Sequence, residues 1–373
     1  MKNLWLGMLV VAGSFAGAQE TVANPYVQLM EKAAAHAKAH GQTVTPALSP
    51  NDATVLSGAV PVGELQARGI KVIPWTTNDP EKMKAVIRTG VDGLISDRPD
   101  LLQKAVAEER ASSAEMAEKL KGFDVQGHRG GRGLHPENTL PAFEGGLDNL
   151  IDTIETDTGV TTDRVSLIWH DQFLNPQSCR RADGAEYADA NKVYIRDISM
   201  VEAQKTFICD KVHFGAEQKN DPALSPVAVA FAAKEGLISP YVPTYVEQLF
   251  RFAAFYAEYY RTGAGKGSPH AKERAAAGAR VKFNLETKIL PEGLPESLEP
   301  GGNHTVGPQV FVDTLCGAIK RNHMEARVDV QSFDFRTLVL VEEQYPGIQT
   351  FYLTGDPKTL GSALVPEGLR ATP

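Results

Sequence analysis

Residues 126–143 read QGHRGGRGLHPENTLPAF, residues 154–157 read IETD and residues 165–171 read VSLIWHD. In each stretch charged or ionisable side chains lie at or next to a short strand-like run. That pattern is typical of a β-strand whose carboxyl end carries functional groups. The three stretches together indicate an α/β fold with a polar site built at the ends of its strands.

Strand-like runs alternate with helical stretches along the chain, which favours a parallel sheet. The eight candidate strands are residues 70–75, 93–96, 123–128, 153–158, 165–169, 281–287, 327–332 and 348–353. Most of them end in polar or ionisable residues, and a (β/α)8 barrel builds its active site from the C-terminal ends of its strands. We therefore expect a (β/α)8 TIM barrel rather than an open sheet.

One segment interrupts this alternation. Residues 172–242 are rich in Asn, Pro, Asp and Gly, and they directly follow the strand that is expected to end at His170. We expect them to form a cap-like insertion over the barrel mouth, stiffened by a bridge between Cys179 and Cys209. Cys316 lies in an apolar helical pattern and is expected to be a buried thiol.

Three carboxylates are candidate metal ligands. Side chains alternate along a strand, so Glu155 and Asp157 point to the same face, roughly 7 Å apart. Glu286 ends another strand, in the stretch FNLETK. Carboxylates gathered on one face repel unless a cation or protons lie between them, and three oxygen ligands suit one divalent cation, Mg²⁺ or Ca²⁺.

Two histidines and two cations complete the predicted site. His128 and His170 each close a strand, and histidine can give or take a proton near neutral pH. Arg129 can bind two phosphate oxygens at once, and Lys288 lies on the same strand face as Glu286. This set of groups is what cleavage of a phosphodiester needs. Aromatic walls are expected from Trp75 and Phe333, which could equally be core residues.

These residues resemble the glycerophosphodiester phosphodiesterase family. The matching elements are His128-Arg129-Gly130, Glu137-Asn138-Thr139 with Ala142, Glu155 with Asp157, His170-Asp171, Glu286 with Lys288, and Gln331-Ser332-Phe333. The resemblance implies a TIM barrel that hydrolyses glycerophosphodiesters to glycerol 3-phosphate and an alcohol, through a cyclic phosphate. It implies His128 and His170 as acid and base, Glu155, Asp157 and Glu286 as metal ligands, and Glu137 beside Arg129 and Lys288 in substrate binding.

The order of the elements departs from the family. The family ends on a WTVN strand and a GVDGIITDxPD element, whereas here WTTN (residues 75–78) and GVDGLISDRPD (residues 90–100) precede His128. This order predicts a circular permutation. Residues 26–101 would hold the last two strand–helix units, residues 102–121 a helical linker, and residues 122–373 the first six strand units. A partial duplication and a domain-swapped dimer are the rival interpretations.

Residues 1–18 have the pattern of a secretory signal peptide, with cleavage expected after Ala18. The mature protein is then expected to be a single barrel over residues 19–373. We expect it to be exported, either to the periplasm or out of the cell. The net charge of −8 argues against nucleic acid as a partner, and no segment predicts stable membrane insertion. The expected partner is a small glycerophosphodiester, bound by a monomer or homodimer. The head group stays open. A lysophospholipase D-like activity on lysophospholipids and a non-catalytic phosphodiester-binding role are the alternatives.

Overall fold

The computed structural model describes residues 24–294 and 302–372 of this chain, so the predicted signal peptide lies outside the described residues. Parallel pairing joins seven strands in the order β1-β11-β10-β9-β4-β3-β2. Their bounds are β1 (Ala47–Pro50), β2 (Gly93–Ser96), β3 (Asp124–Gly127), β4 (Thr153–Val160), β9 (Lys282–Thr287), β10 (Val328–Ser332) and β11 (Gln349–Thr354).

An extended segment, residues 72–75, closes the gap between β1 and β2. It forms parallel bridges from Val72 to Leu48 and from Trp75 to Asn51. On its other side the amide of Ile95 donates to the carbonyl of Pro74 at 3.0 Å. Eight parallel segments therefore form a closed ring, which confirms the predicted α/β barrel. All eight ring segments are contributed by this one chain.

One predicted barrel strand does not belong to the ring. Residues 165–169 do form a strand, β5 (Ser166–Ile168), but it pairs antiparallel with the far end of β4 and with β8 (Thr244–Tyr245). The eighth place is taken by β1, whose ALSP sequence is too short and too proline-rich to stand out as a strand. Residues 122–373 thus supply five of the ring segments rather than six, and the N-terminal part supplies three rather than two.

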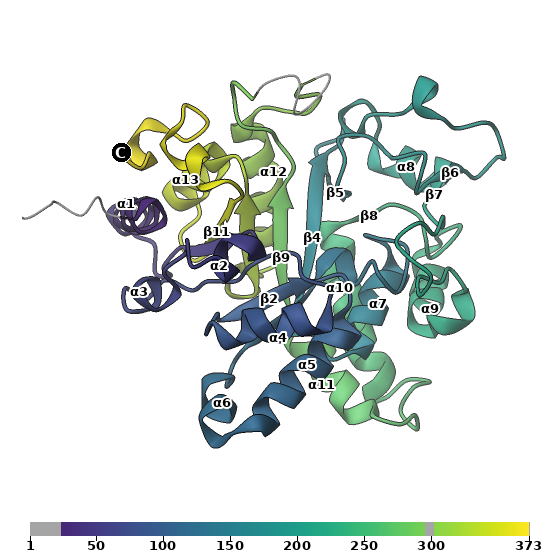
Figure 1. The fold of residues 1–373 in the computed structure, drawn as a ribbon. Coiled ribbons are helices and arrows are strands. Elements are labelled where there is room, and N and C mark those ends of the chain that lie inside the picture. The colour runs from purple at the N-terminus through teal and green to yellow at the C-terminus, as the bar shows by residue number, and fades with distance from the viewer. Residues whose placement is uncertain (1–23, 295–301, 373) are drawn as a thin grey trace, which may run out of the picture.

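The ends of the described chain meet on one side of the barrel. Helix α1 (Pro25–Ala39) lies beside the C-terminal segment (Figure 1), where the amide of Thr372 donates to Gln28 Oε1 at 2.8 Å. The first and last described residues therefore both lie between β11 and β1 in the order of the ring. The predicted linker at residues 102–121 is helical, as α5 (Pro99–Ser112) and α6 (Ala114–Lys119).

Helices surround the ring and bury their apolar faces against it. The remaining ones of this layer are α2 (Asp52–Leu56), α3 (Val62–Gln66), α4 (Pro80–Arg88), α7 (Leu140–Asp148), α10 (Val246–Arg261), α11 (Ala271–Arg280), α12 (Pro308–Arg321) and α13 (Phe335–Gln344). Side-chain caps begin several of them; Thr139, for example, accepts the amide of Ala142 at the start of α7. Cys316 is a buried free thiol on α12, as predicted.

The segment 172–242 has two parts. Its first part, with β6 (Arg180–Arg181), α8 (Met200–Thr206) and β7 (Phe207–Ile208), stands above the strand ends beside β5 (Figure 1). A small core of its own includes Trp169, Leu174 and Phe207, together with the Cys179–Cys209 disulfide. The predicted bridge is therefore present in this cap.

The second part of the segment, α9 (Pro226–Glu235), turns back onto the barrel. Its residues Val227 and Phe231 join the main core, so this helix belongs to the barrel wall rather than to the cap. Within residues 24–294 and 302–372, no helix combines the length and apolar character needed to cross a bilayer.

Candidate active site

Neighbouring strands bring the three predicted metal ligands together at the C-terminal mouth of the ring. In the parallel register of β4 and β9, Asp157 lies opposite Glu286, and Glu155 lies two residues before Asp157 on the same face. One oxygen from each of these carboxylates lies within 4.8 Å of the others, and all three side chains are buried. The three carboxylates that the sequence pattern selected thus lie together in the structure.

The charges of this cluster suit a hard cation. Burial and the neighbouring Asp157 raise the pKa of Glu155 well above its usual value, and burial raises that of Glu286 to about 7. Burial also disfavours the charge on Asp157, but Arg129, His170 and Lys288 outweigh it and lower the pKa of that group. Three buried carboxylates repel one another, and a divalent cation accepting an oxygen from each would relieve that repulsion.

Hydrogen bonds hold the carboxylates in place. Glu155 accepts the amide of Arg129 at 3.0 Å and the side chain of Gln331, from β10, at 2.6 Å. Asn138 donates to Asp157 at 3.2 Å. An ionised carboxylate can accept about four hydrogen bonds, so these donors leave lone pairs on all three carboxylates for a ligand. The sequence selected Gln331 only as part of a family element, and the structure shows that its side chain donates to Glu155.

His128 is oriented by a residue that the sequence did not select. Its Nδ1 lies 2.5 Å from Oδ1 of Asp97, which follows β2. Asn78 and Arg132 also donate to Asp97, each at 2.7 Å. Burial opposes the charge on Asp97, but its contacts with His128 and Arg132 hold the pKa of that carboxyl well below its usual range. Asp97 therefore accepts the Nδ1 proton, and Nε2 of His128 faces the site, 3.8 Å from Glu155.

His170 has a matching arrangement on the cap side. It follows β5, outside the ring, and its Nδ1 lies 2.8 Å from Oδ1 of Asp171. Asn175 donates to the other oxygen of Asp171 at 2.7 Å. Burial lowers the pKa of both His128 and His170 to about 4, so that both imidazoles are neutral at pH 7 in the free protein. Each ring thus offers Nε2 as a proton acceptor.

The phosphate-binding prediction concerns Arg129, Lys288 and Glu137. The buried Arg129 donates to Glu137 at 2.6 Å, while its Nε has no hydrogen-bond partner within the described residues. Lys288 donates to Glu286 at 2.9 Å and lies 3.9 Å from Asp157. Glu137 is not among the residues that line the cavity. It holds Arg129 from behind, while Nε of Arg129 lies 3.4 Å from Oδ2 of Asp157 and its charge faces the carboxylate cluster.

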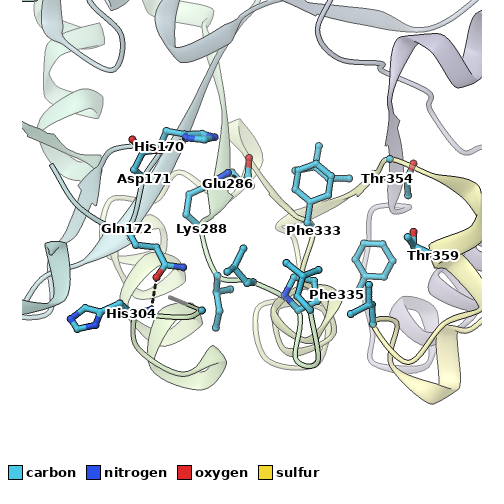
Figure 2. Close-up of a pocket in the computed structure, with 18 of the residues that line it drawn as sticks. His170, Asp171, Gln172, Glu286, Lys288, His304, Phe333, Phe335, Thr354 and Thr359 are labelled. Carbon is cyan, nitrogen blue, oxygen red and sulfur yellow. Dashed lines mark hydrogen bonds and ion pairs between the residues drawn. The ribbon is translucent and has the colours of Figure 1, made fainter. Parts of the chain in front are cut away.

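These groups line a cavity of about 330 Å³ at the barrel mouth. Both predicted aromatic residues lie on its wall, where the rings of Trp75 and Phe333 meet edge to face with centroids 5.4 Å apart. From the adjoining cavity, Figure 2 shows Phe333 opposite His170, Glu286 and Lys288. The structure therefore brings every predicted site residue except Glu137 to one cavity wall.

Comparison with known proteins identifies the family of this chain. The model of the glycerophosphoryl diester phosphodiesterase family matches residues 13–101 and 128–367 of the chain. The chain belongs to this family. It is thus a phosphoric diester hydrolase, of a family that acts on glycerophosphodiesters. No curated protein matches its sequence significantly.

Several solved structures are similar to this phosphodiesterase. A Silicibacter pomeroyi protein assigned as a glycerophosphoryl diester phosphodiesterase is 20% identical, with 67% of this chain and 68% of that chain covered and a TM-score of 0.44. An Oleispira antarctica phosphodiesterase in complex with the product sn-glycerol-3-phosphate is 15% identical, with 61% and 65% covered and a TM-score of 0.35. A glycerophosphodiester phosphodiesterase from Agrobacterium tumefaciens is 12% identical, with 59% and 62% covered and a TM-score of 0.33.

Proposed function

We propose that this phosphodiesterase cleaves glycerophosphodiesters to glycerol 3-phosphate and an alcohol, with His128 and His170 as its proton-transfer groups. The observation that carries the proposal is the pair of histidines, each backed by a carboxylate at Nδ1, on either side of the carboxylate cluster. The partner is a small molecule that enters the cavity, and nothing in this arrangement calls for nucleic acid.

Glu155, Asp157 and Glu286 would hold one divalent cation, Mg²⁺ or Ca²⁺. When bound, such an ion would neutralise phosphate charge and favour the ionised form of a coordinated hydroxyl. The protein's own contribution is Arg129 and Lys288, whose buried positive charges would hold the phosphate next to both histidines.

The positions of the two histidines support different roles for them. The cavity of about 330 Å³ that holds the carboxylate cluster is called the polar cavity, and a larger cavity adjoins it. His128 lines only the polar cavity, whereas His170 lines both cavities. His128 Nε2 would therefore take the proton from the glycerol hydroxyl as that oxygen forms its bond to phosphorus. His170 would give a proton to the alcohol oxygen as the bond between phosphorus and that oxygen breaks.

The second half of the reaction reverses these roles. Water adds to phosphorus with His170 as base, and His128 returns a proton to the glycerol oxygen as the ring opens. The sum is one diester and one water converted to glycerol 3-phosphate and an alcohol. His170 must be protonated for the first step, and the negative charge of a bound phosphate raises its pKa in the complex. A purely binding role would not require either proton-transfer group, so we place it second.

Release of glycerol 3-phosphate from glycerophosphocholine by the purified protein tests this function. We expect release that EDTA abolishes and that added Mg²⁺ or Ca²⁺ restores. His170→Asn and His128→Asn should each lower kcat by about 10²–10⁴-fold. A matched control is His323→Asn, which changes an exposed histidine just after α12. Phosphate binding without turnover by the folded wild-type protein would favour the binding role.

We also propose that the protein is exported and that the order of its elements is a circular permutation of the family order. The Cys179–Cys209 disulfide supports export, because such bonds persist in oxidising compartments. The meeting of Gln28 and Thr372 supports the permutation, because the two ends of the chain lie side by side in the connection that the family order would join. Cell fractionation tests the first proposal, and a rejoined chain, described below, tests the second.

A further inference from the structure

A second and larger cavity, of about 380 Å³, adjoins the polar one. The two cavities share five residues, which are His170, Glu286, Lys288, Phe333 and Leu353. Two of them, His170 and Lys288, are groups that the proposed function places beside the phosphate. Any group attached to that phosphate and directed away from His128 would therefore enter the larger cavity, which we call the outer chamber.

Beyond Phe333 most of the wall of the outer chamber is apolar, with Thr354, Asp356 and Thr359 as its polar members. Its aliphatic and aromatic side chains come from the segment after β9, the start of α13 and the C-terminal segment, and include Ile289, Leu290, Phe335, Leu360, Leu364 and Val365. Figure 2 shows Phe333 and Phe335 on this wall, with Thr354 and Thr359 beside them. A wall of this kind binds apolar groups best, because water leaves it on binding.

Two cationic groups at the rim of the outer chamber already have partners within the protein, whereas among the described residues the carboxylate of Asp356 accepts only a backbone amide. Lys192 lies over the ring of Phe173, with its Nζ 4.2 Å from the centroid, and His304 pairs with Asp197 at 2.7 Å. Lys192 also lies 5.4 Å from the centroid of Tyr194. The ammonium group of Lys192 thus already lies over the rings of Phe173 and Tyr194, where a cationic head group would otherwise bind.

We propose that the preferred substrate is a phosphodiester with an apolar chain or ring on its leaving alcohol, as in an alkyl ester of glycerol 3-phosphate, and that the outer chamber binds that group. The proposal rests on the function proposed above, because that function places the phosphate beside His170 and Lys288, with the leaving alcohol on the side of His170. An acyl chain carried on the glycerol would start on the side of His128, away from the chamber.

Glycine 355 offers a direct way to fill the outer chamber. It lines the chamber, its φ is not in the left-handed region, and a Cβ built on it would meet nothing within 4 Å. Gly355→Trp should therefore place an indole in open space without backbone strain. Gly368 is a matched control, since a Cβ there also meets nothing within 4 Å and the residue does not line the chamber.

The experiment compares kcat/KM for three substrates below their aggregation concentrations: glycerophosphocholine, the octyl ester of glycerol 3-phosphate, and a lysophosphatidylcholine with an eight-carbon chain. We expect the octyl ester to exceed glycerophosphocholine by tenfold or more. The lysophosphatidylcholine carries its chain on the glycerol, and a gain for this substrate alone would contradict the proposal. Gly355→Trp should bring the ratio of apolar to polar kcat/KM close to one, and Gly368→Trp should preserve the wild-type ratio.

Two further results would overturn the proposal. One is equal kcat/KM for all three substrates, and the other is a preference that Gly355→Trp leaves unchanged. If Gly355→Trp does not fold, Leu364→Gln, at a half-buried chamber residue, replaces it with the same expected loss of ratio. Turnover of glycerophosphocholine without a preference contradicts only this inference, whereas no turnover of any diester contradicts the proposed function as well.

Discussion

Asp97 and His128 are 31 residues apart in the chain, and the Asp97 Oδ1 and His128 Nδ1 atoms lie 2.5 Å apart in the barrel. Asp97 follows β2 and His128 follows β3, so two adjacent parallel strands supply the two halves of the proposed proton-transfer unit. The N-terminal part of the chain is therefore part of the active site, and it does more than complete the ring.

Replacement of Asp97 should impair proton transfer more than binding. We expect Asp97→Asn to lower kcat by about 10–100-fold with little change in KM, because an amide can no longer fix the Nδ1–H form of His128. The acidic limb of the pH–rate profile should shift as well. Asp92→Asn, at the opposite end of β2, is the control. An unchanged kcat in Asp97→Asn would mean that His128 needs no oriented tautomer.

Metal binding should release protons near neutral pH. The pKa of Glu286 is raised to about 7 and that of Glu155 well above its usual value, so a cation must displace protons from both groups. For every proton that the ion displaces, the apparent affinity for Mg²⁺ or Ca²⁺ should fall by about tenfold when the pH is lowered by one unit below 7. Calorimetry in two buffers of different ionisation enthalpy measures the release. Glu286→Gln should remove part of it, and binding at pH 7 without release would contradict the assignment.

The order of the segments can be reversed by engineering. A chain that runs from residue 122 to residue 372 and continues through a short linker into residues 24–121 should fold and retain activity. The reason is that the joined ends already lie together at Gln28 and Thr372. By contrast, deletion of residues 24–101 removes three ring segments and Asp97, and should leave an aggregated product. Circular dichroism and glycerol 3-phosphate release measure both, and an active deletion variant would refute the role of the N-terminal part.

The disulfide should stabilise the cap. It closes a loop with a sequence separation of 30 residues, for which chain entropy predicts a contribution of about 3–4 kcal/mol. We expect the Cys179→Ser/Cys209→Ser variant to lower the unfolding temperature of the cap and to raise KM, because Phe173 and Tyr194 of the cap line the outer chamber. Differential scanning calorimetry with and without reductant measures this. Cys316→Ala should keep the reductant sensitivity, and a double Ser variant without a change in stability would contradict the prediction.

Local sequence patterns predicted how the polar groups are placed on the strands of the ring. The alternation of Glu155 and Asp157 on one strand face, the second strand with Glu286, and His128 at its strand end all follow from local periodicity. These features need only the two-residue repeat of a strand and the rule that parallel strands end at one edge. The structure confirms them because a closed ring leaves each strand with one inward face.

Other features depended on pairings and packing that local periodicity does not reveal. Strand β5 lies outside the ring because it forms a hairpin with the end of β4, and β1 belongs to the ring because β11 and residues 72–75 provide partners on both sides. Asp97 could not be matched with His128 until strand neighbours were known, and Glu137 lies behind Arg129 rather than on the cavity wall.

The sequence by itself determined the family, the strand-end chemistry and the pairing of Cys179 with Cys209 in one loop-rich segment. Only the tertiary structure decided which strands close the ring, which carboxylate orients each histidine, and how the apolar outer chamber meets the polar site. The physical reason is that periodicity and residue type act over a few neighbouring residues. Ring closure and cavity shape depend on packing between segments that the chain order does not place side by side.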